Sequence, residues 1–511
     1  MRMAPRHAVL VLIAVTTVLR LGWAAALEPT NDEAYHWLYT VHPALSYFDH
    51  PPMLMWVEQL GLTVCGGWVH PLSLRLGFVL LFAGSTWVMF RWTAGMYGDL
   101  AGWWAAVALN LTGYYTAFGG TFALPDSPFL FFALLTFWKA TDAVQSSSIK
   151  SWLSVGVGFA GAMLSKYHAV LLPAGVVLYL LITPSRRRLL WSPGPYLAVL
   201  IGLIGFLPVV VWNANHDWAS IRFQSGRAAH EDLTPFLHEG PLKSFGGPIV
   251  YLLPWIWFWL VVELVRGITR FRSLAGADRL LICLSIVPLV FFFMVSGRTR
   301  TFLPHWPLIG FVPLYPLLGV NWVKLRERFP AASKTFLTLW TVTLFALAAL
   351  LLCQARYGII TFPAKEKDPT EDISGWESVA EELDRRGVLS EPNTFLFTNM
   401  WYDSGQLAFA VRERVPVACY HSFDARGFAF WSQPKDYVGK TGFLVISGEE
   451  DEAGVFREYA SFFRRMTLAA EFHSSRSGRP FRRVRVYRCE DQLLPYPFDF
   501  KRGVMQAPQT H

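Results

Sequence analysis

The chain has 511 residues, of which 53% are hydrophobic and 16% aromatic, and its formal net charge is +8. Only 16% of the residues are charged, whereas soluble domains average about a quarter. This composition excludes an ordinary soluble protein and predicts a membrane protein. The basic residues of the predicted inner loops account for the positive charge, so it lends no support to nucleic-acid binding.

Apolar stretches recur along the first two thirds of the chain and predict about eleven membrane spans. Each is roughly long enough to cross a hydrocarbon core of about 30 Å. In chain order the segments are 8–27, 72–90, 100–118, 122–140, 152–165, 168–183, 196–214, 248–265, 280–296, 302–321 and 335–354. The sequence therefore predicts a transmembrane domain over residues 1–354 and a soluble domain over 355–511.

The first apolar segment has two interpretations. Arg2 and Arg6, the apolar run and the Ala24–Ala26 stretch also fit a cleaved signal peptide. The run is longer than a usual signal core, so we favour an uncleaved anchor. Arg20 lies inside it, and a cation there needs a partner or access to headgroups. Asp32 or Glu33 would be suitable partners, and a purely structural role is the alternative.

Basic residues in alternate loops predict the orientation of the spans. With the N-terminus inside, the inner loops carry sixteen Lys and Arg residues and the outer loops six. The first outer loop, residues 28–71, has none. Since basic loops stay in the cytoplasm, the N-terminus is expected to be cytoplasmic. An odd number of spans then places the C-terminal domain in the bacterial periplasm.

The last third of the chain has the pattern of a small α/β domain. Trp376, Val379 and Leu383 share one helical face, and 404–411 also looks helical, while 394–399, 443–447 and 484–488 have strand-like composition. Cys419 and Cys489 fall in this domain and would be able to pair in an oxidising compartment. The sequence leaves that pairing open.

Polar residues gather in the predicted outer loops, where carboxylates come from two loops and cations from two others. These residues, in chain order, are Asp32, Glu33, Tyr35, Asp49, His50, Asp126, Lys166, Arg298, Arg300 and His305. Fixed cations stabilise a phosphate leaving group, and a carboxylate accepts a proton from an attacking hydroxyl. The set suits transfer of a group from an anionic phosphate carrier at a membrane surface.

Each of these residues also has a plainer interpretation. Thr30 and Glu33 fit a capping box at a helix start, and Asp126 fits a helix N-cap. Lys166 would be able to extend to lipid headgroups. Arg298 and Arg300 would be able to bind bulk lipid phosphate.

Five motifs together resemble one superfamily. They are Asp32-Glu33 after the first span, Tyr47-Phe48-Asp49-His50-Pro51-Pro52, Pro125-Asp126-Ser127-Pro128, Ser165-Lys166-Tyr167, and the basic stretch before Pro304-His305-Trp306-Pro307. This pattern resembles the C-type glycosyltransferases. It is closest to the bacterial branch related to protein O-mannosyltransferases and to lipid A aminoarabinose and galacturonic acid transferases. The stretch Asp368–Asp372 followed by Gly375-Trp376 is similar to the tail of the bacterial members.

The resemblance implies a C-type helical bundle and a polyprenyl-phosphate sugar donor of the undecaprenyl-phosphate type. It implies that Asp32 acts at the catalytic centre, together with the acid Asp126, and that Lys166, Arg298 and Arg300 hold the donor phosphate. Relatives often have Lys in the last basic stretch and Tyr at the position of His305. The acceptor is left open among a lipid such as lipid A, a glycan and a protein.

The chemistry expected is an inverting displacement without a cofactor, because a phosphate leaving group needs charge stabilisation more than protonation. A divalent metal is an alternative, since Asp32, Glu33, Asp49 and Asp126 offer hard oxygen ligands. A transporter or lipid-linked glycan flippase is the competing function. Transporters place ionisable residues near the membrane midplane, whereas here they cluster in outer loops.

Overall fold

A computed structural model describes residues 4–228, 240, 242–299, 302–363, 368–448 and 452–498. The chain forms two compact units. The first comprises residues 1–24, 50–61 and 75–347, and the second comprises 25–49, 62–74 and 348–511. The predicted domain boundary at residue 354 remains a prediction.

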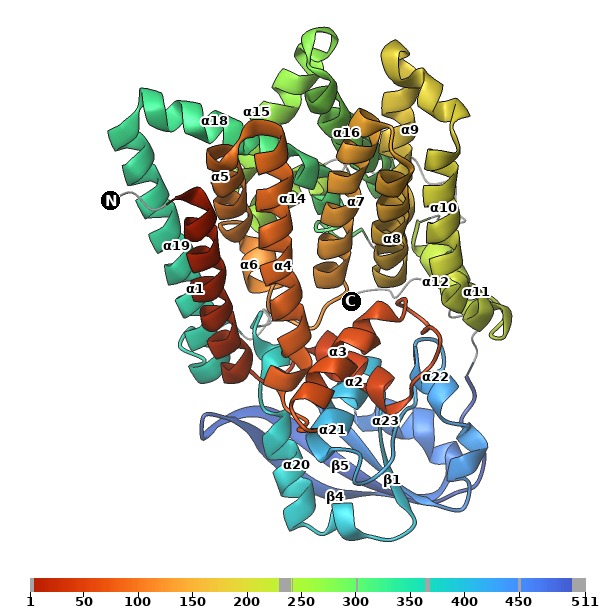
Figure 1. Ribbon diagram of the computed structural model, residues 1–511. Coiled ribbons are helices and arrows are strands. Elements are labelled where there is room, and N and C mark those ends of the chain that lie inside the picture. Colours follow the sequence, from red (N-terminus) through yellow and green to blue (C-terminus); the bar gives the residue numbers. More distant parts are fainter. Residues whose placement is uncertain are drawn as a thin grey trace. The chain divides into compact units, whose positions relative to one another are not determined.

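The first unit is helical, as the apolar segments predict, and each predicted segment overlaps one helix or consecutive helices (Figure 1). The described helices that lie wholly or mostly in this unit are, in chain order, α1 Pro5–Ala26, α3 Met53–Val64, α4 Pro71–Tyr97, α5 Asp99–Asn110, α6 Gly113–Ala117, α7 Asp126–Ser146, α8 Ile149–Ser165, η1 Tyr167–Leu171, α9 Leu172–Ile182, η2 Pro184–Trp191, α10 Pro193–Gly205, α11 Leu207–Ala214, α12 Ala219–Ala228, η3 Leu242–Gly246, α14 Gly247–Leu252, α15 Pro254–Thr269, η4 Phe271–Ser273, α16 Gly276–Ser296, α17 Leu308–Phe311, η5 Val312–Leu314, α18 Tyr315–Arg328 and α19 Pro330–Tyr357.

Several of these helices are long and apolar enough to cross a membrane. Within the described part of the chain five qualify, and a sixth is added if η2 and α10, bent by 59°, form one span. The remaining predicted spans are shorter or broken. The segment 100–118, for example, divides into α5 and α6, where the Thr112 hydroxyl donates to the Ala108 carbonyl at 3.0 Å. The count of eleven spans stays a prediction.

Small residues allow the helices of the first unit to pack closely. α7 lies beside α8, and α5 packs against α18 (Figure 1). A Cβ atom added at Gly319 of α18 would lie only 2.4 Å from the Ala101 carbonyl oxygen of α5. Only glycine therefore fits at this crossing, in line with the use of small residues where membrane helices approach each other.

Arg20 is buried within the helices of the first unit. Its Nη2 donates to Asn110 Oδ1 at 3.2 Å, its Nη1 donates to the Thr16 carbonyl at 3.2 Å, and its guanidinium lies 4.3 Å from the Phe82 ring centre. These contacts show the structural role that was the alternative to pairing with Asp32 or Glu33. The cation is accommodated by polar and aromatic groups on neighbouring helices.

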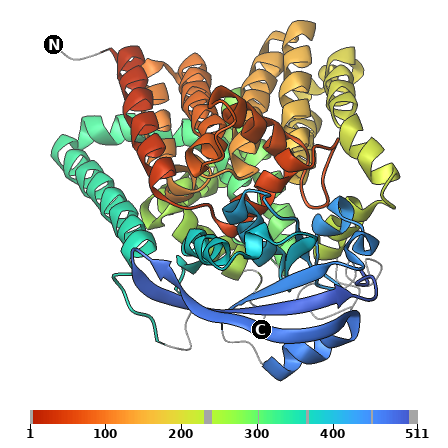
Figure 2. The same cartoon turned by 90° about the horizontal axis from the view of Figure 1, so that it is seen from below.

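The second unit contains a five-stranded sheet in the order β2-β1-β3-β5-β4. The strands are β1 Thr394–Thr398, β2 Val417–Cys419, β3 Thr441–Ser447, β4 Phe463–Arg476 and β5 Arg479–Gln492. β1 is parallel to β2 and β3, whereas β5 is antiparallel to β3 and β4. The long β4–β5 pair runs through the blue part of Figure 2.

The helices of this unit are α2 Asn31–Val41, α20 Trp376–Arg385, α21 Trp401–Val411, α22 Phe428–Trp431 and α23 Glu452–Tyr459. α2 packs on α21, and a Cβ atom at Gly405 of α21 would lie 2.9 Å from the Tyr35 Cα of α2. The start of the predicted outer loop is thus a helix that packs closely on α21.

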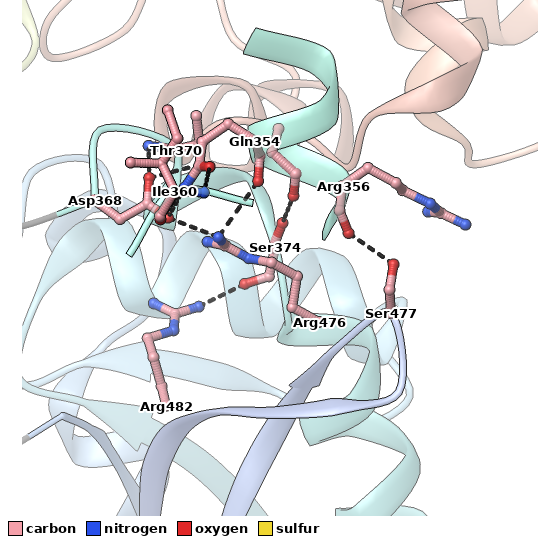
Figure 3. Close-up of polar contacts among 10 residues, drawn as sticks. Gln354, Arg356, Ile360, Asp368, Thr370, Ser374, Arg476, Ser477 and Arg482 are labelled. Carbon is pink, nitrogen blue, oxygen red and sulfur yellow. Dashed lines mark hydrogen bonds and ion pairs between the residues drawn. The ribbon is translucent and has the colours of Figure 1, made fainter. Parts of the chain in front are cut away.

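A polar cluster connects the last turn of α19, and residues that follow it, to the β4–β5 hairpin (Figure 3). Arg476 Nη1 donates to Asp368 Oδ2 at 2.6 Å, and Gln354 Nε2 donates to the same oxygen at 2.9 Å. Arg482 Nη2 donates to the Ser374 carbonyl at 2.8 Å. Burial alone would raise the pKa of Asp368, but the hydrogen bonds from Arg476 and Thr370 lower it. The tail motif Asp368–Trp376 therefore has a structural role, because it connects the end of α19 to the β4–β5 hairpin.

The predicted strands at 394–399, 443–447 and 484–488 coincide with β1, β3 and β5, and Trp376, Val379 and Leu383 are all buried on α20. β2 and β4 were missed. Cys419 and Cys489 are free buried thiols.

Candidate functional site

The first unit holds a buried ion pair between two of the predicted site residues. Asp126 is the first residue of α7, and Lys166 follows directly after α8. Lys166 Nζ donates to both carboxylate oxygens of Asp126, at 2.8 and 2.9 Å. The side chains are only 10% and 14% exposed for Lys166 and Asp126. Neither plainer interpretation holds here, because the N-cap of α7 is Pro125 rather than Asp126 and the lysine ammonium is held by a carboxylate.

Two histidines share a small pocket with this ion pair. Asp126, Lys166, His168 and His305 all line it, together with Tyr115 and Trp306. His305 is half-buried and stacks on Tyr114, with ring centres 5.5 Å apart and planes 10° apart. The pocket therefore combines a carboxylate, an ammonium and two imidazoles on an aromatic wall, a set that is able to hold an anion and to move a proton.

The predicted arginine pair is only partly described. Arg298 lies just after α16 and is exposed. Arg300 lies outside the described residues.

Asp32 and Glu33 lie in the first turn of α2 in the second unit, in different surroundings. Thr30 Oγ1 accepts from the Glu33 amide at 3.3 Å, and Glu33 Oε2 accepts from the Thr30 amide at 2.9 Å. This is the capping box that the sequence offered as the plainer interpretation, and Glu33 is fully buried. The Asp32 carboxylate is exposed, and no group in the described part of the chain forms a hydrogen bond or ion pair with it.

Asp49 is held within the second unit by three side chains. Tyr35 donates to Asp49 Oδ1 at 3.2 Å, Tyr39 donates to the same oxygen, and Arg426 Nη1 donates to Oδ2 at 3.3 Å. Tyr35 also accepts from the Gly427 amide at 2.9 Å. Asp49 accepts hydrogen bonds from all three side chains, and Tyr35 connects Asp49 to the Gly427 amide. These contacts fix the conformation of the segment around α2. His50, the next residue, belongs to the first unit and is half-buried.

Sequence reasoning missed two residues of these arrangements, Tyr114 and Arg426. It noted His168 in the stretch Ser165-Lys166-Tyr167-His168 but assigned it no role. Tyr114 and Arg426 gave no signal, because each contacts its partner across a long separation in sequence.

Comparison with known proteins places the chain among sugar transferases. Residues 49–212 match the family model described as dolichyl-phosphate-mannose-protein mannosyltransferase. Lipid A galacturonosyltransferase RgtD of Rhizobium johnstonii is 24% identical over 87% of this chain and 91% of its own length. An undecaprenyl phosphate-alpha-4-amino-4-deoxy-L-arabinose arabinosyl transferase of Erwinia tasmaniensis is 24% identical over 66% of this chain and 61% of its own length.

Among solved structures, ArnT from Cupriavidus metallidurans bound to undecaprenyl phosphate has the same fold, with a TM-score of 0.62. It is 17% identical, and the match covers 94% of this chain and 97% of that one. The resemblance that the sequence motifs indicate is confirmed: the chain is similar to lipid A sugar transferases and shares the fold of ArnT.

Proposed function

We propose that this enzyme transfers a sugar from an undecaprenyl-phosphate carrier to lipid A or a related envelope lipid on the periplasmic face of the inner membrane. The donor and acceptor classes are those named for the relatives. The orientation follows the excess of basic residues in the predicted inner loops. With eleven spans, residues 355–511 form a periplasmic α/β domain.

The observation that carries this proposal is the Asp126–Lys166 pair. A lysine ammonium has three N–H donors, and two of them point to the carboxylate oxygens of Asp126. One donor is left for a phosphate oxygen. Because Asp126 fixes the position of Nζ in a mostly buried site, the lysine is preorganised to hold the anionic carrier.

The roles of the other residues follow from their charge and exposure. Arg298 and Arg300 contribute positive charge for the same phosphate. Asp32 is the general base, and Glu33 caps the helix that carries it. Asp49 and Tyr35 maintain the structure of the segment around α2. His50 and His305 bind substrate.

The reaction is a single displacement. An acceptor oxygen forms a bond to the anomeric carbon of the sugar while the bond from that carbon to the carrier phosphate breaks. The acceptor proton passes to Asp32, and the carrier leaves as a phosphate monoester whose new charge is stabilised by Lys166. The configuration at the anomeric carbon inverts, and we propose that no cofactor is needed.

The test is transfer of radiolabelled sugar from undecaprenyl phosphate to lipid A by the purified full-length enzyme, with and without a chelator. We expect transfer in both conditions and an inverted anomeric linkage in the product. Absence of transfer to any envelope lipid, with labelled protein as the product instead, would exclude the proposed acceptor. A retained anomeric configuration would exclude direct displacement.

A further inference from the structure

The first unit contains a second, larger polar cavity far from Asp126. It has a volume of about 630 Å³ and lies among the last turns of α7 and α9, η2 and the first turn of α16. Seven of its lining residues are polar or charged: Thr141, Gln145, Tyr179, Thr183, Ser185, Arg186 and Arg279. Its size falls within the range of about 300–1,000 Å³ that is usual for small-ligand sites.

This cavity and the Asp126 site lie at opposite ends of one helix. Asp126 begins α7, whereas Gln145 lies in its last turn. At about 1.5 Å per residue, the two ends of this helix are roughly 30 Å apart, which is the thickness of a hydrocarbon core. Because the segment 122–140 is a predicted span, we place the cavity at the opposite membrane surface from Asp126, and it is distinct from the proposed site of transfer.

The lining of the cavity has an unbalanced positive charge. Arg186 and Arg279 both line it, and no Asp or Glu does. Arg279 Nη2 donates to the carbonyls of Arg272 and Leu274, at 3.3 and 3.2 Å, but its buried Nε has no partner among the described residues. A buried guanidinium donor without a partner, in a cavity that a second arginine also lines, suits a phosphate oxygen.

Two carboxylates are direct sequence neighbours of lining residues, and both already have other partners. Asp142 pairs with Lys139 at 3.0 Å, and Asp278 accepts a hydrogen bond from Tyr97. In the described part of the chain neither Arg186 nor Arg279 has a carboxylate within 4 Å. The arginine pair is thus left for an anion from outside the chain.

The surroundings favour a lipid over a soluble anion. η2 presents Arg186, Arg187 and Arg188 and ends at Trp191, which is 92% exposed, while Leu181 of α9 is 51% exposed. Arginines next to an exposed tryptophan and exposed aliphatic side chains are typical of the headgroup level of a membrane. Basic pockets between membrane helices at this level bind anionic headgroups.

We propose that this cavity binds the phosphate of an anionic phospholipid from the leaflet opposite to the transfer site. Arg186 and Arg279 hold the phosphate oxygens, and the hydroxyls of Thr183 and Tyr179 lie within the same cavity. The acyl chains follow the exposed apolar surface of α9.

The test uses delipidated full-length enzyme titrated with phosphatidylglycerol and followed by native mass spectrometry. Arg186→Gln with Arg279→Gln should weaken binding by about tenfold or more, because two charge-assisted hydrogen bonds are lost. Arg187→Gln with Arg188→Gln makes the same change in net charge outside the cavity and should alter binding less than about twofold. Equal weakening by both pairs would assign binding to diffuse surface charge and overturn the proposal.

Ala277→Phe supplies a second test, because it fills the cavity without removing a charge. It should also abolish the lipid adduct while leaving sugar transfer intact, which separates this inference from the proposed function. Inorganic phosphate at millimolar concentration should not displace the lipid. Full displacement would show a site for a soluble anion, and an adduct that persists in Ala277→Phe would place the lipid elsewhere.

Discussion

Asp126 and Asp32 each lie in the first turn of a helix, one in each unit of the molecule, but their carboxylates have opposite surroundings. Asp126 has a side chain that is 14% exposed and binds Lys166 through both oxygens. Asp32 is exposed and, within the described ranges, accepts no hydrogen bond. A carboxylate that holds an ammonium is committed to that cation, whereas an unengaged one is available for a proton. This difference supports the proposed roles, in which Asp126 positions the donor-binding Lys166 and Asp32 is the base.

The largest effect is expected for Asp32→Asn. The amide keeps the size of the side chain but does not accept a proton, and loss of a general base costs about 10²- to 10⁴-fold in rate. Binding of undecaprenyl phosphate should be unchanged. The measurement is the rate of sugar transfer at saturating donor, with donor binding determined separately. If the variant keeps more than about a tenth of the normal rate, Asp126 becomes the first candidate for the base.

Lys166→Ala is expected to impair both binding and stability. The change removes the donor for the carrier phosphate and leaves the Asp126 carboxylate buried without its cation. Removing one partner of a buried ion pair costs about 3–5 kcal/mol. Thermal unfolding in detergent and titration with undecaprenyl phosphate measure the two effects.

The matched control is Lys166→Ala combined with Asp126→Asn. This double variant no longer buries an unpaired charge, so it should recover most of the lost stability without recovering donor binding. Restored donor binding in the double variant would mean that the lysine acts only by neutralising Asp126.

The helices of the first unit were largely predictable because apolar length is itself the signal for a membrane helix. The positions at which these helices break were not predictable. The segment 100–118 reads as one apolar run, but the chain leaves the helix between Asn110 and Gly113. The Asn110 side chain hydrogen-bonds to Arg20 and Thr86 there, and such tertiary partners are not visible in a local pattern.

The sheet also shows what a local sequence pattern fails to predict. β1 and β3 have buried, apolar sequences and were predicted, whereas β4 has Arg464, Arg465, Glu471 and His473 within its fourteen residues and was missed. It is an edge strand, and charged residues are characteristic of edges.

For the site, the sequence identified the residue types of the Asp126–Lys166 pair but not their pairing, because 40 positions separate them.

Glu28 is a half-buried carboxyl group of the second unit, and its titration makes stability depend on pH. Burial, together with the neighbouring charge of Glu377, raises the pKa of Glu28 to about 7 from its ordinary value of 4.5. The folded state therefore holds this proton more tightly than the unfolded chain. Stability should fall as the pH rises from about 4.5 to 7 and then level off.

Glu28→Gln removes that titration, so it should stabilise the protein at pH 8 and have little effect at pH 4. The amide oxygen is still able to accept from the Gly375 amide, which lies 3.5 Å from Glu28 Oε1. Glu413, whose pKa is also raised to about 7 by burial, should preserve part of the slope. Thermal unfolding across this pH range is the measurement, and greater stabilisation at pH 4 than at pH 8 would contradict the expected sign.

The smallest effect concerns Glu33 and sharpens the contrast with its neighbour. Glu33 and Thr30 satisfy each other's amides, and replacing a capping residue by alanine costs about 1 kcal/mol. Thr30→Ala should therefore lower stability by about this amount and leave the transfer rate of the folded enzyme nearly unchanged. Glu33→Gln should do still less, because glutamine also serves in a capping box. The two neighbouring acidic residues would then have different roles: the buried Glu33 stabilises the start of α2, and the exposed Asp32 accepts the proton. A transfer rate for Glu33→Gln as low as that of Asp32→Asn, at unchanged stability, would mean that both carboxylates take part in the reaction.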